Sequence, residues 1–162
     1  MRYRVENTCS FCKIVRGQQE SQVVFEDELS LAFLDRRPLF LGHCLLIPRD
    51  HYETLTDLPP SLVAPFFANA QLLSRAVQQA MGAEGILLAI NNRVSQSVPH
   101  LHAHIVPRRH GDGLRGFFWP RTQYDGEAHM AQVGDQIRSA LAALRSTGSP
   151  ANDRAAMKGA KQ

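Results

Sequence analysis

The chain has 162 residues, of which 44% are hydrophobic and 20% charged, and its formal net charge is +3. This length suits one domain with a substantial core, and the composition is that of a globular protein. No run approaches the roughly 18 apolar residues of a membrane span, and the N-terminus lacks the apolar stretch of a secretory signal. We therefore expect a cytoplasmic protein without a membrane partner.

The positive charge is not concentrated in a way that suits nucleic acid. The segment 146–162 carries three cationic side chains against one acidic one, and elsewhere Lys and Arg are scattered among acids apart from short clusters. A protein that follows a phosphate backbone needs a broad basic surface. A small anionic ligand is therefore favoured over a duplex, and no specific nucleic acid partner is expected.

Apolar patterning predicts strands at 22–26 and 29–34, joined through a turn, and a further strand at 43–47 that ends at Pro48 because proline cannot donate to a ladder. Apolar residues then recur at three- and four-residue spacing from Pro60 to Met81, which predicts an amphipathic helix ending near Gly82.

In the second half, the continuous apolar run 85–91 predicts a buried strand, and a polar loop at 92–98 leads to another strand. We expect these two strands to be adjacent and central. Helical spacing returns at 127–144, whereas 146–162 has no apolar periodicity and is predicted to be a disordered tail. The expected fold is one α+β domain with an antiparallel sheet of about five strands, one long helix and a C-terminal helix.

The most informative motif is an alternation of histidine with apolar residues, in which His100, His102 and His104 flank Leu101 and Ala103. Residues i, i+2 and i+4 of a strand share one face, so the three imidazoles are expected to line one surface while Leu101, Ala103 and the following isoleucine enter the core. Imidazole ligates metals and acts as nucleophile or general acid near neutral pH. A merely solvated strand face is the less favoured alternative.

Three cysteines cannot all pair within one chain, and a reducing compartment would keep them as thiols. Cys9 and Cys12 form a tight C-x2-C arrangement that can chelate one metal ion. Cys44 lies in an apolar run and is expected to fill the core.

Several ordered blocks together resemble the histidine triad (HIT) superfamily of nucleotide hydrolases and transferases. They are Phe-Cys-Lys-Ile at 11–14, the apolar strand ending in Asp at 31–35, Gly-His-Cys-Leu-Leu-Ile-Pro-Arg-Asp-His at 42–51, and His-Leu-His-Ala-His-Ile-Val at 100–106. The resemblance implies a HIT domain over 1–145, with the matching part at about 9–108 and a C-terminal extension at 109–145.

The resemblance implies that His102 attacks the α-phosphorus of a nucleotide and forms a nucleotidyl-histidine that water or another acceptor resolves. His104 would donate a hydrogen bond to the phosphate or the leaving group. Ser97 and Gln96 would meet the phosphate oxygens. The loop from Asn91 to Gln96 is shorter than the glycine-rich loop of many members, and Arg93 could compensate by pairing with a phosphate.

By the same resemblance, Cys9, Cys12, His51 and His100 would hold a structural zinc ion in a closed tetrahedral site, and no organic cofactor is expected. A closed site leaves no open position for water, so the metal would brace the N-terminal segment and leave the chemistry to other residues. The alternative is that the two cysteines are ordinary thiols.

Asp35 is expected to accept hydrogen bonds from the ribose hydroxyls, with Phe11, Ile14 and Phe33 offering an apolar slot for the base. Without the resemblance, these three side chains would be assigned to plain core and Asp35 to a strand-end cap. His43 is expected to orient a triad histidine.

The leading hypothesis is a hydrolase acting on purine nucleoside phosphoramidates or dinucleoside polyphosphates through His102. One alternative is a metal-dependent hydrolase that uses triad histidines as ligands, since H-x-H on a strand is also a metal-ligand pattern. Another is a nucleotide-binding interaction protein with little turnover. The resemblance also implies a homodimer formed by joining two sheets.

Overall fold

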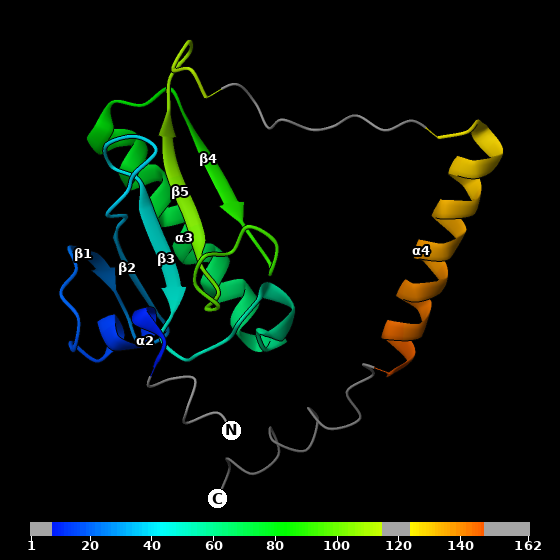
Figure 1. Ribbon diagram of the computed structural model, residues 1–162, viewed down its shortest axis with the longest axis horizontal. Coiled ribbons are helices and arrows are strands. Elements are labelled where there is room, and N and C mark those ends of the chain that lie inside the picture. The colour runs from blue at the N-terminus through cyan, green and yellow to red at the C-terminus, as the bar shows by residue number, and fades with distance from the viewer. Residues whose placement is uncertain (1–7, 115–123, 148–162) are drawn as a thin grey trace, which may run out of the picture. The chain divides into compact units, whose positions relative to one another are not determined.

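The computed structural model describes residues 8–114 and 124–147. The chain divides into two compact units, Met1–Arg115 and Gly116–Gln162. The first unit holds the sheet, and the described element of the second is the helix α4 (Glu127–Thr147) (Figure 1). Helix α4 extends three residues beyond the predicted end at 144, and the rest of the predicted tail, 148–162, lies outside the described residues.

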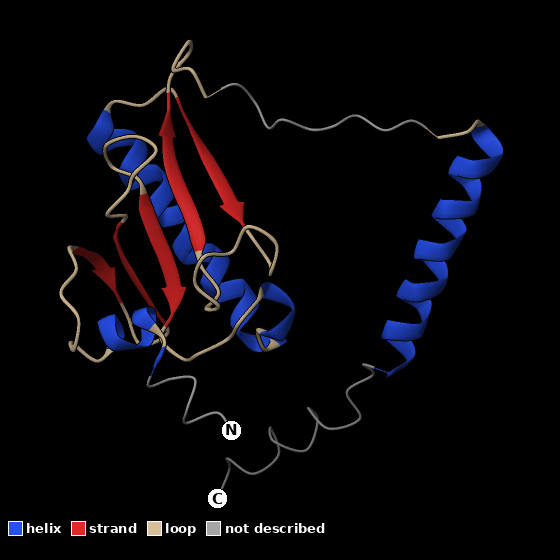
Figure 2. Cartoon of the chain, viewed as in Figure 1, coloured by secondary structure: helices blue, strands red, loops and turns tan. Residues whose placement is uncertain are grey.

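Five antiparallel strands form a single sheet in the order β1-β2-β3-β5-β4 (Figure 2). Their bounds are β1 (Val23–Glu26), β2 (Ser30–Leu34), β3 (Cys44–Pro48), β4 (Gly85–Ile90) and β5 (Ala103–Arg108). The expected α+β architecture with a five-stranded antiparallel sheet is confirmed. Pro48 is the last residue of β3 instead of lying just beyond it, and it pairs with Ser30 of the neighbouring strand.

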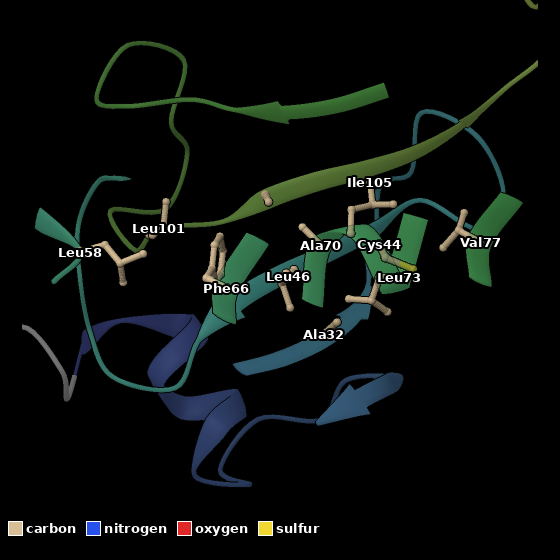
Figure 3. Packing of buried hydrophobic residues seen from close by; sticks show 11 residues of the cluster. Ala32, Cys44, Leu46, Leu58, Phe66, Ala70, Leu73, Val77, Leu101 and Ile105 are labelled. Atoms are coloured by element: carbon tan, nitrogen blue, oxygen red, sulfur yellow. The ribbon is translucent and has the colours of Figure 1, made fainter. Parts of the chain in front are cut away.

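Both faces of the sheet are covered where β2 and β3 run. Helix α3 (Pro60–Met81) packs on one face, where it contributes four buried side chains to the main core, Phe66, Ala70, Leu73 and Val77 (Figure 3). Cys44 belongs to this core, as predicted. The short helix α2 (Ser10–Val15) covers the opposite face and packs Phe11 and Ile14 against Phe33 and Leu45.

The ends of α3 follow from local chemistry and match the predicted bounds. Pro60 occupies the first turn, where its fixed φ suits a helix and its missing N–H breaks no hydrogen bond. Gly82 ends the helix in the left-handed conformation at φ 55°, which glycine adopts without steric cost. Neither this helix nor any other in the described ranges is long and apolar enough to cross a membrane.

The prediction that β4 is a buried central strand is wrong. β5 lies between β3 and β4, so β4 is an edge strand with one neighbour. None of its residues is buried, and Leu88 is 41% exposed. Ile86 and Ile90 pack against the main core. The apolar run therefore forms an edge strand of which one face is covered by the core.

The histidine-bearing strand also starts later than predicted, at Ala103. His100 and Leu101 donate their backbone N–H groups to Val98 and Tyr52 carbonyls, so the chain here is held by loops and not by a neighbouring strand. His100 and His102 are therefore buried in a loop instead of lining an exposed strand face. The apolar partners, Leu101, Ala103 and Ile105, enter the core as predicted.

Gly42 precedes His43 in a turn that only glycine fits comfortably. Its φ is +92°, and an added methyl group would lie 2.5 Å from Cγ of Met81. We expect Gly42→Ala to lower the free energy of unfolding by about 1–3 kcal/mol, through backbone strain and this clash together. Gly17→Ala is the matched control, because φ is +68° there and no atom lies within 4 Å of the new methyl group. Urea unfolding measures both, and equal losses would contradict the role assigned to the Met81 contact.

Candidate functional site

A cleft of about 340 Å³ opens on the α2 side of the sheet. Its walls come from α2, from the chain just beyond it, from β2 and β3, and from the loop that leads into β5. Seven of the residues singled out from the sequence line it together: Phe11, Ile14, Phe33, Asp35, Ser97, His102 and His104. The cleft thus joins an apolar slot, a carboxylate and two imidazoles.

Three sequence-based candidates, Asn91, Arg93 and Gln96, are not among the residues that line this cleft. Gln96 instead fastens its own loop. Its side-chain oxygen accepts the backbone N–H of Arg93 at 2.6 Å, and its side-chain nitrogen donates to the carbonyl of Glu53 at 2.6 Å. Gln96 therefore ties this loop to Glu53, directly before Ser97 and Val98, which do line the cleft.

Sequence reasoning missed further lining residues, which are Gln19, Ser21, Leu34, Arg36, Arg37, Leu45 and Val98. The first two belong to a short polar connection that carries no motif. Arg36 and Arg37 were visible only as a basic pair beside Asp35. Leu45 could have been found from strand alternation, because it pairs directly with His104 across β3 and β5.

The ring of His102 is held in one tautomer by the backbone. Its Nδ1 lies 2.7 Å from the carbonyl oxygen of His100, which can only accept, so Nδ1 carries a proton and the neutral form of the ring has its lone pair on Nε2. The ring also meets Phe11 edge-on, with centroids 5.4 Å apart. His102 is 2% exposed, so backbone and aromatic contacts together fix the ring beside the cleft.

His104 receives its orientation from His43, as the sequence led us to expect. The backbone N–H of Leu39 donates to Nδ1 of His43 at 3.2 Å, which places the His43 proton on Nε2. That proton is donated to Nδ1 of His104 at 3.0 Å, so the His104 proton resides on Nε2. Burial, with smaller effects of His102 and His43, lowers the pKa of His104 to about 4, and the ring is neutral at pH 7.

Four thiol and imidazole groups converge beside these rings. The ligand atoms of Cys9, Cys12, His51 and His100 all lie within 4.8 Å of one another. His100 Nδ1 is 3.5 Å from each sulfur, and His51 Nδ1 is 3.3 Å from that of Cys12. In tetrahedral zinc sites, typical bond lengths place neighbouring sulfur and nitrogen ligands about 3.5 Å apart. The cluster therefore has the spacing of a tetrahedral metal site.

The second nitrogen of His100 explains why its Nδ1 is available as a ligand. His100 Nε2 donates to the carbonyl of Pro48 at 2.9 Å, so Nδ1 presents a lone pair to the two sulfurs. Burial lowers the pKa of His100 to about 4, which keeps the imidazole in the neutral form that binds metals.

A second group, Asp35, His43 and His104, also gathers its ligand atoms within 4.8 Å. Asp35 lies 3.6 Å from Nδ1 of His43. This carboxylate beside the triad was not foreseen in the metal-dependent alternative. The hydrogen bond between His43 and His104 uses the His104 Nδ1 lone pair, however, so the two imidazoles form a hydrogen-bonded pair with Asp35 beside them.

The histidine motif, the cleft and the sheet are those of one family. The model of the HIT domain matches residues 16–111, more than half of the chain, and the chain belongs to the HIT family. The adenylylsulfatase HINT3 of Arabidopsis thaliana is 41% identical over 112 residues, which span 68% of this chain and 57% of that protein. The chain thus matches little more than half the length of this relative.

Two other relatives are covered almost completely. The adenosine 5′-monophosphoramidase hnt1 of Schizosaccharomyces pombe is 35% identical over 136 residues, 83% of this chain and 98% of that protein. The crystal structure of a zinc-bound histidine triad family protein from Mycobacterium smegmatis is 39% identical and superposes with a TM-score of 0.64, covering 88% of this chain and 99% of that one.

The buried state of His104 makes folding depend on pH. An exposed imidazole titrates near 6.5 and His104 near 4, so between these values the unfolded chain binds more protons. The free energy of unfolding therefore increases with pH across this window. We expect this increase to be smaller in His104→Gln, because the variant lacks the buried imidazole. Urea midpoints measured between about pH 4.5 and 7.5 with chelator present test this. His110→Gln is the control, since that ring is 93% exposed, and an unchanged slope in His104→Gln would contradict the assignment.

Proposed function

We propose that this chain is a nucleotidyl-transfer hydrolase that cleaves at the α-phosphate of a purine nucleoside phosphoramidate or a dinucleoside polyphosphate. The observation that carries the proposal is the complementary state of two adjacent imidazoles. His102 keeps a lone pair on Nε2, whereas His104 keeps a proton on Nε2, and their ring centroids are 4.9 Å apart. One ring is thus prepared to attack and the other to donate.

In the first step, Nε2 of His102 attacks the α-phosphorus, an N–P bond forms, and the bond from phosphorus to the leaving nitrogen or oxygen breaks with its electron pair on the departing atom, a leaving nitrogen taking up a proton from water in the cleft. His104 Nε2–H donates to the phosphate or to the departing group, which stabilises the charge that develops there. In the second step water attacks the phosphorus, the N–P bond breaks with its electron pair returning to Nε2 of His102, the water releases a proton to the cleft, and a nucleoside monophosphate leaves. Two displacements replace one difficult displacement.

The rest of the cleft fits the nucleoside. The Asp35 carboxylate would accept the 2′ and 3′ hydroxyls of ribose, and its position is fixed by the N–H of Arg37, which donates to it at 2.8 Å. Phe11, Ile14 and Phe33 would hold the base, and the edge-to-face pair of the two phenylalanines, 5.3 Å apart, keeps this wall in place. Ser97 lies at the same cleft as the histidines and would contact phosphate oxygens. Asn91, Arg93 and Gln96 would act through the loop they form.

We further propose that Cys9, Cys12, His51 and His100 hold a structural zinc ion. The spacing of the four ligand atoms and the tautomer of His100 support this, as does the zinc-bound relative. With four protein ligands the metal would cross-link parts of the chain. It would have no open coordination position for a substrate or water. It would join α2 to the loop that carries His102.

One observation supports a second candidate, a metal-dependent hydrolase. Asp35, His43 and His104 supply a carboxylate and two imidazoles close together at the cleft. If a catalytic ion bound there, stripping it with a chelator would stop turnover at once and its return would restore it. Under the leading proposal, the chemical step survives chelation for as long as the fold persists.

The edge strand β4 supports a further expectation, that two copies of the chain associate by joining their sheets. Its outward side has no strand partner among the described elements, and its apolar residues are partly exposed. An unpaired apolar edge is a template for pairing with another strand. We propose a homodimer on this basis, with a purine nucleotide as the small-molecule partner.

His102→Ala tests the nucleophile. We expect kcat for an adenosine phosphoramidate and for a diadenosine polyphosphate to fall by about 10⁴-fold or more, because no other side chain replaces the attacking nitrogen. Rapid quenching followed by mass spectrometry should show a nucleotidyl adduct on wild-type protein and none on the variant. His110→Ala is the matched control, since its ring is exposed and lies outside the cleft. Full turnover by folded His102→Ala would overturn the mechanism.

Cys12→Ser tests the metal cluster. Wild-type protein is expected to bind about one zinc per chain and to lose thermal stability on chelation, because a closed structural site contributes binding energy to folding. The variant should bind little zinc, and its Tm should barely respond to chelator. Cys44→Ala provides the control, as this thiol lies in the main core. Metal analysis that finds equal zinc in Cys12→Ser and Cys44→Ala would refute the site.

A further inference from the structure

The end of the cleft next to the apolar slot is polar, which the proposed function does not require. Gln19, Ser21 and Arg36 line the same cleft as Phe11 and Phe33. An apolar slot alone holds any flat base, whereas polar groups at its edge can distinguish one base from another. These three side chains are therefore the groups of the cleft that can distinguish one base from another.

Ser21 and Arg36 line the cleft and also border a neighbouring hollow of about 470 Å³, whose walls include Asp35 and none of the histidines. With the phosphate at His102 and the ribose at Asp35, these residues lie on the nucleoside side of the substrate. Their polar groups are therefore placed to meet the base and not the leaving group.

Arg36 is anchored in this position. Its Nη2 donates to the backbone carbonyl of Glu20 at 2.6 Å, which ties the end of β2 to the chain between α2 and β1. One of the five guanidinium N–H groups is used in this bond, and the others are donors with no accepting capacity. The anchored guanidinium thus gives the base end of the cleft a fixed set of donors.

Ser21 adds a hydroxyl group that can still form hydrogen bonds. Its Oγ is shielded from solvent and has no hydrogen-bond partner within the described part of the chain. A shielded polar atom of this kind costs free energy until a partner is supplied, and a ligand in the adjoining cleft can supply one. Gln19 brings an amide, which both donates and accepts.

We propose that Arg36, together with Ser21 and Gln19, selects a purine that carries a carbonyl group at position 6, as guanine and hypoxanthine do, over adenine. The carbonyl and N7 of such a base accept hydrogen bonds, which suits a donor-only guanidinium, whereas adenine presents an amino group at position 6. The Ser21 and Gln19 oxygens can accept from the N–H groups of the same base. This inference rests on the proposed nucleotidyl chemistry.

The test compares kcat/KM for guanosine and adenosine 5′-phosphoramidates. Wild-type protein is expected to prefer guanosine roughly tenfold, which is typical of one good bidentate contact. Arg36→Gln should bring the ratio close to one mainly by lowering the guanosine value, and Ser21→Ala should lower the ratio in the same direction. Arg75→Gln, an exposed arginine on α3, is the control and should keep the wild-type ratio.

A wild-type ratio of one or below, or a ratio unchanged in both Arg36→Gln and Ser21→Ala, would overturn the inference while leaving the proposed function standing. Absence of turnover with both substrates would instead count against the proposed function. Calorimetric titration with GMP and AMP then decides the base preference without turnover. Tighter binding of GMP that is lost in Arg36→Gln supports the inference, and equal binding of the two nucleotides refutes it.

Discussion

The site depends on His100, a side chain that is completely buried. Nδ1 of His100 faces the sulfurs of Cys9 and Cys12, and its Nε2 donates to the carbonyl of Pro48. The backbone carbonyl of His100 accepts a hydrogen bond from Nδ1 of His102. This single residue connects the start of α2, the end of β3 and the orientation of His102. A substitution of either cysteine would therefore alter the orientation of His102 without changing any residue of the cleft.

The sequence predicts the two long helices well because their signals are local and repeated, whereas the six-residue helix α2 was not predicted, since it is too short to show helical periodicity. Helix α3 has its predicted bounds, since Pro60 and Gly82 determine its ends through their own backbone preferences. The position of β4 could not be obtained in this way, because an apolar run looks the same in a central strand and in an edge strand covered on one side. The late start of β5 was not predicted for a related reason. The backbone N–H of Leu101 donates to the carbonyl of Tyr52, which is far away in the sequence.

Only part of the candidate site could be predicted from the sequence, because some of its residues have no local sequence signal. The spacing of the two cysteines and the alternation of the three histidines indicated chemistry directly, whereas the grouping of Cys9, Cys12, His51 and His100 into one set came from the resemblance to the HIT family. Gln19, Ser21 and Arg36 have no such signal, because polar residues in a short connection are common in any loop. Their role follows from a shared wall of the cleft, which is a property of the folded chain alone.

The hydrogen bond from the Leu39 backbone amide to His43 limits proton transfer through His43 and His104. A peptide N–H does not release its proton, so the chain from Leu39 through His43 to His104 ends at a fixed donor and cannot carry protons out to solvent. Because His104 is neutral and carries a single proton, on Nε2, it would serve the proposed transfer as a hydrogen-bond donor and keep that proton. The proton that a departing nitrogen takes up and the proton that the attacking water releases would then both be exchanged with water in the cleft.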